Sequence, residues 1–215
     1  MNSEQNYTAL KSHQIKTNPE FSDCFKRSGS SVFSELAIID SRVPHLKQLI
    51  NGLRKDVALI FVNKNQDVFD ALENVLFRPS TIHIISHGEP GRLLVANRWI
   101  DQEDLYSNES RISAWASGLT GNPEIFLYGC RVAEGEVGAK FANTLSRITG
   151  CKVAASTSLT GASEFGGDWD LQFQSAPLSG RIALSVAAQR NWKGILAPEV
   201  SLQNASSSEG TTSAD

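Results

Sequence analysis

The feature that most constrains the fold is a series of short, mainly apolar runs separated by segments with helical periodicity. Five of these runs are predicted to be strands: Leu36–Asp40, Val57–Val62, Thr81–Ile85, Glu124–Tyr128 and Lys152–Ala155. Strands that are apolar along their length, rather than at alternate positions, are typical of parallel strands buried on both faces. The pattern therefore predicts an α/β fold, in which helices cover both faces of a mostly parallel sheet.

The segments between these runs supply the helices and one further strand. Apolar residues three and four apart predict helices over Leu46–Leu53, Val68–Leu76, a weaker one over 102–118, and Val137–Ile148, which Gly150 closes. Residues 91–100 are predicted to form a hairpin. Asp168–Phe173 alternates between polar and apolar side chains, as an edge strand does. The sheet is therefore expected to have six strands.

Composition separates a compact domain, residues 35–197, from two polar ends. Residues 1–34 and 198–215 are rich in serine and lack a sustained apolar period, so both are expected to be loosely ordered. The segment that begins at Pro198 resembles the first strand of a Calx-β repeat, which would make this chain the N-terminal piece of a longer protein. A frayed tail explains the same residues equally well.

Charge and motifs exclude several classes of function. The chain has 20 Lys and Arg against 23 Asp and Glu, a net charge of −3, whereas nucleic-acid-binding proteins usually carry a basic excess. No apolar run is long enough to cross a bilayer, and the N-terminus lacks the apolar core of a Sec-type signal peptide. The sequence has no P-loop, no G-x-G-x-x-G and no G-x-S-x-G, so neither a nucleotide cofactor nor a serine hydrolase is expected.

Reactive side chains follow several of the predicted strands. Asp40 ends the first strand, His87 follows the third and Cys130 follows the fourth. In an open α/β sheet, functional groups gather at the carboxyl ends of the strands. A thiol with a histidine base beside it is a catalytic nucleophile. We therefore expect His87 and Cys130 to form a catalytic pair.

Glycines flank both residues, as His87-Gly88 and Gly129-Cys130. Glycine lets the backbone approach a substrate closely, and the N–H groups of Gly88 and Cys130 are candidates for an oxyanion hole. The helix predicted to begin near Gly135 should favour the thiolate and lower the pKa of Cys130. The chemistry implied is acyl transfer through a tetrahedral oxyanion and a thioester.

These motifs resemble a known group of enzymes. Strand-Ser-His-Gly followed by strand-Tyr-Gly-Cys is similar to the caspase-like cysteine peptidases, which include caspases, gingipains, clostripain, legumain and separase. The stretches ISHGEPGRLLV, FLYGCRVAEGEVGAKFANTLSRITGCKVAAS and LTGASEFGGDWDLQF, within residues 36–175, also resemble a bacterial domain of unknown function. That domain usually opens very large secreted or surface proteins built of repeats.

The resemblance implies a caspase-like three-layer sandwich and a cysteine endopeptidase whose substrate is a protein or peptide, the chain itself included. It also implies an extracellular or cell-surface location, although a cytoplasmic one stays open. In the caspase-like arrangement, the ends of the first and fifth strands shape the specificity pocket, which would involve Asp40, Glu164 and Asp168. Carboxylates there would favour a substrate Arg or Lys. Asp40 and Asp168 are also explained as ordinary turn residues.

Plainer explanations exist for the cysteines and histidines as well. A cysteine after an apolar strand is often only a small core residue. Cys151 has no histidine at a matching position and is expected to pack, Cys24 is incidental, and His83 is expected to be a satisfied core residue. No metal site is expected, because ligands at positions 83 and 87 would meet on a helix but not on a strand. The alternative function is therefore a catalytically inactive caspase-like module for surface anchoring, export or protein binding.

Overall fold

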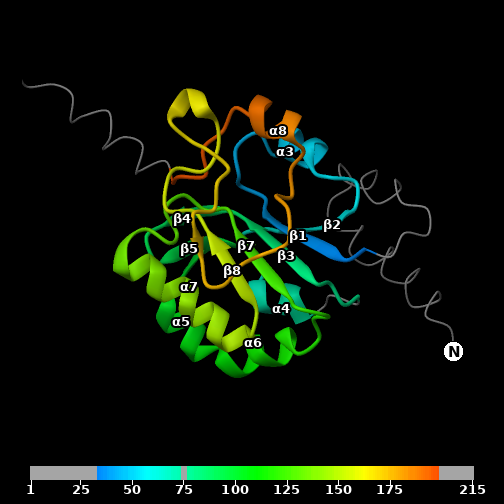
Figure 1. The fold of residues 1–215 in the computed structure, drawn as a ribbon, viewed down its shortest axis with the longest axis vertical. Coiled ribbons are helices and arrows are strands. Elements are labelled where there is room, and N and C mark those ends of the chain that lie inside the picture. Colours follow the sequence, from blue (N-terminus) through cyan, green and yellow to red (C-terminus); the bar gives the residue numbers. More distant parts are fainter. Residues whose placement is uncertain (1–32, 74–76, 199–215) are drawn as a thin grey trace, which may run out of the picture.

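A computed structural model of the chain describes residues 33–73 and 77–198 (Figure 1). Its main sheet has six strands in the order β2-β1-β3-β7-β8-β9. These strands are β1 Glu35–Asp40, β2 Val57–Val62, β3 Thr81–Ile85, β7 Glu124–Leu127, β8 Lys152–Ala155 and β9 Phe173–Gln174. All neighbouring strands are parallel except β8 and β9. The predicted six-stranded, mostly parallel sheet is confirmed.

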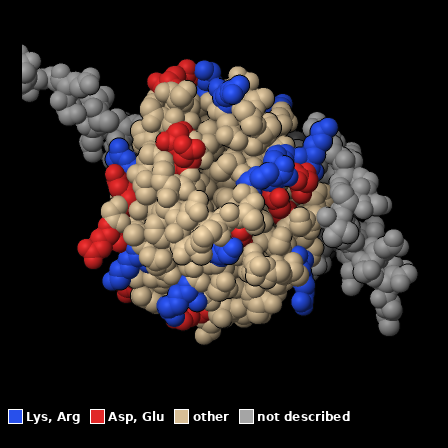
Figure 2. Space-filling view, viewed as in Figure 1, with Lys and Arg blue, Asp and Glu red and all other residues tan. Residues whose placement is uncertain are grey.

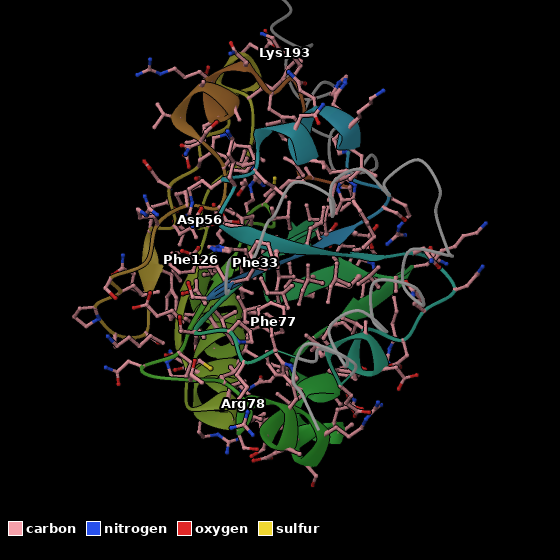
Figure 3. The ribbon with its side chains drawn as sticks, turned by 90° about the vertical axis from the view of Figure 1, so that its right-hand side faces the viewer. Phe33, Asp56, Phe77, Arg78, Phe126 and Lys193 are labelled. Atoms are coloured by element: carbon pink, nitrogen blue, oxygen red, sulfur yellow. The ribbon has the colours of Figure 1, made fainter. Side chains whose placement is uncertain are left out.

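Helices cover both faces of this sheet, as Figures 1 and 3 show. They are α3 Leu46–Gly52, α4 Val68–Glu73, α5 Gln102–Ser107, α6 Glu109–Ala116, α7 Gly135–Thr149 and α8 Val186–Asn191. The helices α4 to α7 pack on one face, and α3 and α8 pack on the other. Successive residues of β1 alternate between the two buried apolar clusters, with Leu36 and Ile38 in one and Ala37 and Ile39 in the other. The fold is therefore a three-layer α/β sandwich.

The predicted hairpin over residues 91–100 is present, and a third strand that precedes it in sequence pairs with it. β4 (His87–Glu89), β5 (Arg92–Val95) and β6 (Arg98–Ile100) form a separate antiparallel sheet in that order. Ala96 and Asn97 make the turn between β5 and β6 with positive φ angles of 54° and 64°. His87 therefore begins a strand that leaves the main sheet directly after β3.

The segment predicted as one helix over 102–118 is instead two, α5 and α6. The chain leaves helical geometry at Asn108, which has φ −113° and ψ 17°. Its Nδ2 donates a hydrogen bond to the Asp104 carbonyl at 2.9 Å, so the asparagine side chain satisfies a carbonyl at the end of α5. The last residues of the stripe predicted over 68–76 lie outside the described residues, as do residues 1–32 with Cys24 and residues 199–215 of the two polar ends.

Two further predictions need correction. The edge strand predicted at Asp168–Phe173 is reduced to β9, because the Asp168 carboxylate accepts a hydrogen bond from the Asp170 N–H and forms a turn. Val137, predicted on the buried face of α7, is 66% exposed, whereas Phe141 and the apolar residues that follow it on that face are buried. Gly150 ends α7 in the left-handed conformation, as predicted.

A buried polar network ties the later part of the chain to the sheet. His83 Nδ1 lies 3.0 Å from Tyr128 Oη, and His83 Nε2 lies 2.9 Å from Glu35 Oε2. Tyr128 Oη also accepts a hydrogen bond from the Ala183 N–H at 3.0 Å. The phenol therefore donates to Nδ1, and Nε2–H donates to the carboxylate. His83 is fully buried and bonded at both ring nitrogens, which confirms that it is a satisfied core residue.

Candidate active site

The order of the main sheet reverses between β1 and β3, and ligands of open α/β sheets bind at such a point. Three chain segments meet at this carboxyl-end edge. Arg42 follows β1, His87 and Gly88 follow β3, and Gly129 and Cys130 follow β7. Because β3 pairs with both β1 and β7, the segments are neighbours although they are distant in sequence.

His87 is half-buried, and its two ring nitrogens have different surroundings. Nε2 lies 3.4 Å from the carbonyl oxygen of Arg42, to which only an N–H can donate. Nδ1 is buried and has no hydrogen-bond partner within residues 33–73 and 77–198. With the proton on Nε2, the lone pair is on Nδ1, which is therefore the nitrogen available to accept a proton.

Cys130 is only 1% exposed, and its thiol contacts the backbone of Thr160. Sγ accepts a hydrogen bond from the Thr160 N–H at 3.2 Å and lies 3.6 Å from the Thr160 carbonyl oxygen. Burial raises the pKa of Cys130 to about 11, and the backbone hydrogen bonds that favour the thiolate only partly offset this effect. The prediction of a lowered pKa is therefore wrong, because desolvation outweighs the nearby N–H groups.

One carbonyl oxygen joins the histidine and cysteine segments. The Leu196 oxygen accepts hydrogen bonds from the N–H groups of Gly88 at 3.0 Å and Cys130 at 3.3 Å. The Leu196 N–H donates to the Thr160 carbonyl at 2.9 Å, and this carbonyl is the one that Cys130 Sγ contacts. The peptide group of Leu196 therefore lies beside the thiol, and its oxygen is held by the two N–H groups that the sequence indicated as a pair.

The residues before Leu196 continue along the same edge. Ala162 N–H donates to the Gly194 carbonyl at 2.8 Å, and Gly161 forms an antiparallel bridge with Ile195. Gly161 has φ 139°, and a Cβ placed there would lie 2.3 Å from the Gly194 oxygen. This position therefore requires glycine. The backbone of residues 194–196 is bound as an extended strand against residues 160–162.

Gly88 and Gly129 face each other rather than open space for a ligand. A Cβ on Gly88 would lie 2.7 Å from the Gly129 Cα, and a Cβ on Gly129 would lie 2.9 Å from the Gly88 Cα. The two glycines allow the turns after β3 and β7 to touch, which brings the N–H groups of Gly88 and Cys130 to one oxygen. Arg131, directly after the cysteine, has a positive φ of 57°, a conformation that costs free energy in a residue with a side chain.

Asp40, predicted to bind substrate, has its carboxylate enclosed by neighbouring groups. Oδ1 accepts from the Arg42 N–H and Nε, and Oδ2 accepts from the Arg42 guanidinium and the Ala96 N–H, at 2.8–3.0 Å. A carboxylate has about four acceptor positions, so these contacts saturate it. The residue is 1% exposed. Its contacts fit a turn carboxylate that holds Arg42, whose carbonyl in turn faces His87.

The other two predicted carboxylates lie in the loop after β8. Asp168 accepts from Ser158 Oγ and from the Asp170 N–H, each at 2.8 Å. Glu164 lies in a short 3₁₀ turn, Ser163–Phe165, and is exposed, with Lys193 Nζ 2.9 Å from its carboxylate. Figure 3 labels Lys193 on the α8 side of the sheet, just before the segment that holds Leu196. In the described part of the chain, neither carboxylate is hydrogen-bonded to His87 or Cys130, so their role in binding substrate stays a prediction.

The sequence interpretation missed Thr160, Gly161 and Leu196, which complete this site. Their contacts are made by backbone atoms, and no reactive side chain marks them. The glycine in Thr160-Gly161 and the apolar residues Ile195 and Leu196 were the only available signals. Cys151 is buried and its Sγ lies 3.7 Å from the Thr149 carbonyl oxygen, which agrees with its predicted packing role.

Substitution of Asp40 tests the structural role of its carboxylate. Asp40→Asn removes the charge that holds Arg42 and turns one acceptor oxygen into a donor that faces other donors. Leaving buried donors unsatisfied costs about 1–3 kcal/mol, so we expect the free energy of unfolding in urea to fall by that amount. Asp170→Asn, at an exposed position, is the matched control and should change it by less than about 0.5 kcal/mol. Equal stability of both variants and the wild type would contradict this role.

Among residues 33–73 and 77–198, no three His, Cys, Asp or Glu side chains gather as metal ligands would. No helix of that part has the length and apolar character needed to cross a membrane. Figure 2 shows acidic and basic side chains interspersed over the face in view rather than collected in one patch.

The fold and these contacts define a three-layer α/β domain with a histidine and a cysteine at the ends of neighbouring parallel strands. The chain belongs to the family of domains of unknown function DUF4347, whose family model matches residues 36–196. The matched region therefore runs from β1 to Leu196 and includes every residue of the candidate site. No curated protein matches the chain.

Proposed function

We propose that this domain is a caspase-like cysteine endopeptidase in which Cys130 is the nucleophile and His87 is the general base. One observation carries the proposal: the N–H groups of Gly88 and Cys130 converge on a single carbonyl oxygen beside the Cys130 thiol. Two backbone donors aimed at one oxygen next to a nucleophile are what stabilises the oxyanion of acyl transfer. If Gly88 and Cys130 served only to pack the core, their N–H groups would not need to converge on one oxygen.

The reaction follows from these positions. His87 Nδ1 takes the thiol proton, and Sγ attacks the substrate carbonyl carbon, while the N–H groups of Gly88 and Cys130 hold the oxyanion. The imidazolium then gives its proton to the leaving amine, which leaves a thioester on Cys130. Water, deprotonated by His87, hydrolyses the thioester and restores the thiol. The Arg42 carbonyl, 3.4 Å from Nε2, orients the ring.

The resting state of the thiol adds a condition to this mechanism. Because burial raises the pKa of Cys130 to about 11, the thiol is protonated at neutral pH. The nucleophile must then be generated by proton transfer to His87 when a carbonyl is in place, rather than be present beforehand as a thiolate. The backbone N–H of Thr160 donates a hydrogen bond to Sγ and so holds the thiol in its resting position.

The substrate residue before the scissile bond should be apolar rather than basic. The Asp40 carboxylate is saturated by Arg42 and Ala96, so it offers no acceptor to an incoming Arg or Lys. Leu196, whose carbonyl occupies the two N–H groups, is fully buried within the apolar cluster between the sheet and the α3–α8 layer. An apolar side chain at that position is therefore accommodated without an unpaired charge.

A peptide electrophile tests the proposal. In a Cys24→Ser, Cys151→Ser background, Cys130 is the only thiol. We expect an acyl-Gly-Ile-Leu chloromethyl ketone to alkylate Cys130 with release of chloride and a proton. Tandem mass spectrometry after peptide mapping should then show the mass of one probe less HCl on Cys130. The same background with His87→Ala should react at least about a hundredfold more slowly, because general-base assistance contributes about 10²–10⁴-fold.

The matched control is the same background with Cys130→Ala, which should take up no probe. Cleavage of a peptide library covering apolar, basic, acidic and asparagine residues before the scissile bond supplies the second readout. If the folded protein neither reacts with the probe nor cleaves any library member, the peptidase proposal is wrong.

The alternative is a catalytically inactive module of the same fold, used for anchoring, export or binding. Two observations favour this alternative: the backbone N–H of Thr160 is hydrogen-bonded to the Cys130 thiol, and the pKa of Cys130 is raised. It predicts that Cys130→Ala and His87→Ala leave every measured property of the domain unchanged except stability. The probe experiment therefore separates the two functions.

A further inference from the structure

We infer that the substrate of this site is the chain itself and that the bond cleaved is Leu196–Ala197. The inference rests on the proposed function and gives it a substrate. Residues 194–196 lie across the candidate site in the arrangement of a bound substrate, and three features of their contacts support this.

The first feature is strand pairing. Extended peptides bind to an exposed backbone edge by main-chain hydrogen bonds. Here Leu196 N–H donates to Thr160 O at 2.9 Å, and Ala162 N–H donates to Gly194 O at 2.8 Å, with Gly161 bridging Ile195 between them. These contacts fix the direction and register of residues 194–196, so they determine which carbonyl reaches the thiol.

The second feature is the carbonyl itself. Leu196 O accepts from Gly88 N at 3.0 Å and from Cys130 N at 3.3 Å, while Leu196 N–H shares the Thr160 carbonyl with Cys130 Sγ. The atom held by the two donors is the oxygen that would become the oxyanion. The amide that follows it, the N–H of Ala197, would be the leaving group. The register therefore selects the Leu196–Ala197 bond rather than its neighbours.

The third feature is a close approach of the two backbones that leaves no room for side chains. A Cβ on Gly161 would lie 2.3 Å from Gly194 O, and a Cβ on Gly194 would lie 2.5 Å from Trp192 and 2.8 Å from Pro44. Glycine at both positions lets the two backbones approach. Leu196 and Ala197 are 0% and 5% exposed, so the segment is enclosed by its own domain. Enclosure and covalent attachment favour cleavage within one molecule, because the reacting groups are already oriented.

The chemistry balances without any further reagent except water. The Cys130 thiol proton moves to His87, and Sγ bonds to the Leu196 carbonyl carbon. The bond from that carbon to the Ala197 nitrogen breaks, and His87 returns the proton to the nitrogen, which becomes a free amine. Water then converts the Leu196 thioester to a carboxylic acid and restores the thiol. The products are a chain that ends at Leu196 and a peptide that begins at Ala197.

The test uses the whole 215-residue chain. Purified wild-type protein and Cys130→Ala are incubated in parallel at several concentrations, and intact-mass spectrometry follows both proteins with time. We expect the wild type alone to yield a fragment ending at Leu196 and a peptide beginning at Ala197. The first-order rate should not depend on protein concentration. Processing that is already complete at purification supports the inference equally if Cys130→Ala stays intact.

Variants of the segment test its register. Leu196→Met keeps an apolar side chain and should retain cleavage within about tenfold, whereas Leu196→Arg should lower the rate at least about a hundredfold. Gly161→Ala places a Cβ against Gly194 O and should displace the segment, slowing cleavage by a similar factor. Gly118→Ala, whose Cβ would have no neighbour closer than 3.2 Å, is the matched control and should cleave as the wild type does. Circular dichroism and thermal melting identify any variant that fails to fold.

The outcomes separate the inference from the function on which it rests. If the peptide electrophile modifies Cys130 and library peptides are cleaved, but Leu196–Ala197 stays intact in the folded wild type, the inference is overturned and the peptidase proposal stands. If neither modification nor any cleavage occurs, the peptidase proposal itself fails. Cleavage at another bond, or unchanged cleavage in Cys130→Ala, also overturns the inference.

Discussion

Gly88→Ala is expected to lower the rate of peptide cleavage by about 10²–10³-fold, because it displaces one donor of the oxyanion site. The new Cβ would lie 2.5 Å from a methyl group of Val132, and 2.7 and 2.8 Å from the backbone Cα and carbonyl carbon of Gly129. A side-chain methyl group can move, but the Gly129 backbone cannot move without the Cys130 N–H. The loss should therefore appear in kcat, since the donors act mainly on the oxyanion.

The same substitution should also destabilise the fold. Overpacking of a closed contact costs about 1–3 kcal/mol, measured as the fall in the free energy of unfolding in urea. Gly129→Ala should behave alike because the contact is reciprocal, and the double variant should cost less than the sum of the two. Gly118→Ala serves as the control for adding one methyl group. A Gly88→Ala protein with wild-type kcat would show that this N–H does not take part in the reaction.

The main sheet was predictable because its strands are buried on both faces. Segments such as Val57–Val62 are apolar at every position, and their bounds agree with β2. Patterns near the surface were less informative. Asn108 interrupts a helical stripe through a backbone hydrogen bond of its own side chain, and Val137 occupies an apolar position of the stripe but faces solvent. Hydrophobic periodicity alone predicts neither the break at Asn108 nor the exposure of Val137.

The two reactive side chains of the candidate site were predictable for a topological reason. Parallel strands end at one edge of a sheet, so residues directly after β3 and β7 must be neighbours whatever separates them in sequence. Strand order and sequence position alone therefore indicate His87 and Cys130 as a pair. The same topology makes their glycines neighbours, although the close contact between Gly88 and Gly129 depends on the tertiary packing of the two turns.

The segment that fills the site was not predictable in this way. Ile195 and Leu196 look like ordinary core residues, and their site contacts are made by backbone N–H and carbonyl groups that every residue has. The raised pKa of Cys130 was not predictable from the sequence either, since enclosure of the thiol is a tertiary effect. Side-chain chemistry thus indicated the candidate pair His87 and Cys130, whereas the segment beside the thiol and the protonation state of the thiol follow only from the fold.

Acidification is expected to destabilise the domain in two stages, and His83 accounts for the first. Burial lowers the pKa of His83 below its usual 6.5, although the hydrogen bond to Glu35 opposes this effect. The unfolded chain therefore binds a proton near pH 6.5 that the native state does not bind. Stability that is fully present above that pH is lost as the pH falls, with a slope of at most about 1.4 kcal/mol per pH unit.

Glu35 accounts for the second stage. Burial alone would raise the pKa of Glu35, but hydrogen bonds from His83 and Arg54 outweigh it and lower the pKa below 4.5. The native carboxylate therefore resists protonation, and its contribution to stability is present above about pH 4.5 and lost below it. Because the two windows differ, a decline between pH 6.5 and pH 5 comes from the histidine and not from the carboxylate.

Urea unfolding at pH steps from 7.5 to 4 measures both stages. His83→Gln should be less stable at pH 7 and should lack the decline between pH 6.5 and pH 5. His45→Gln, at an exposed histidine, is the matched control and should retain that decline. In the wild type, the carbon-bound ring protons of His83 should keep their neutral-imidazole chemical shifts well below pH 6.5. A free energy of unfolding that is constant from pH 7 to pH 5 would mean that His83 gains a proton equally in both states, and the buried network would then have to accept a charged imidazole.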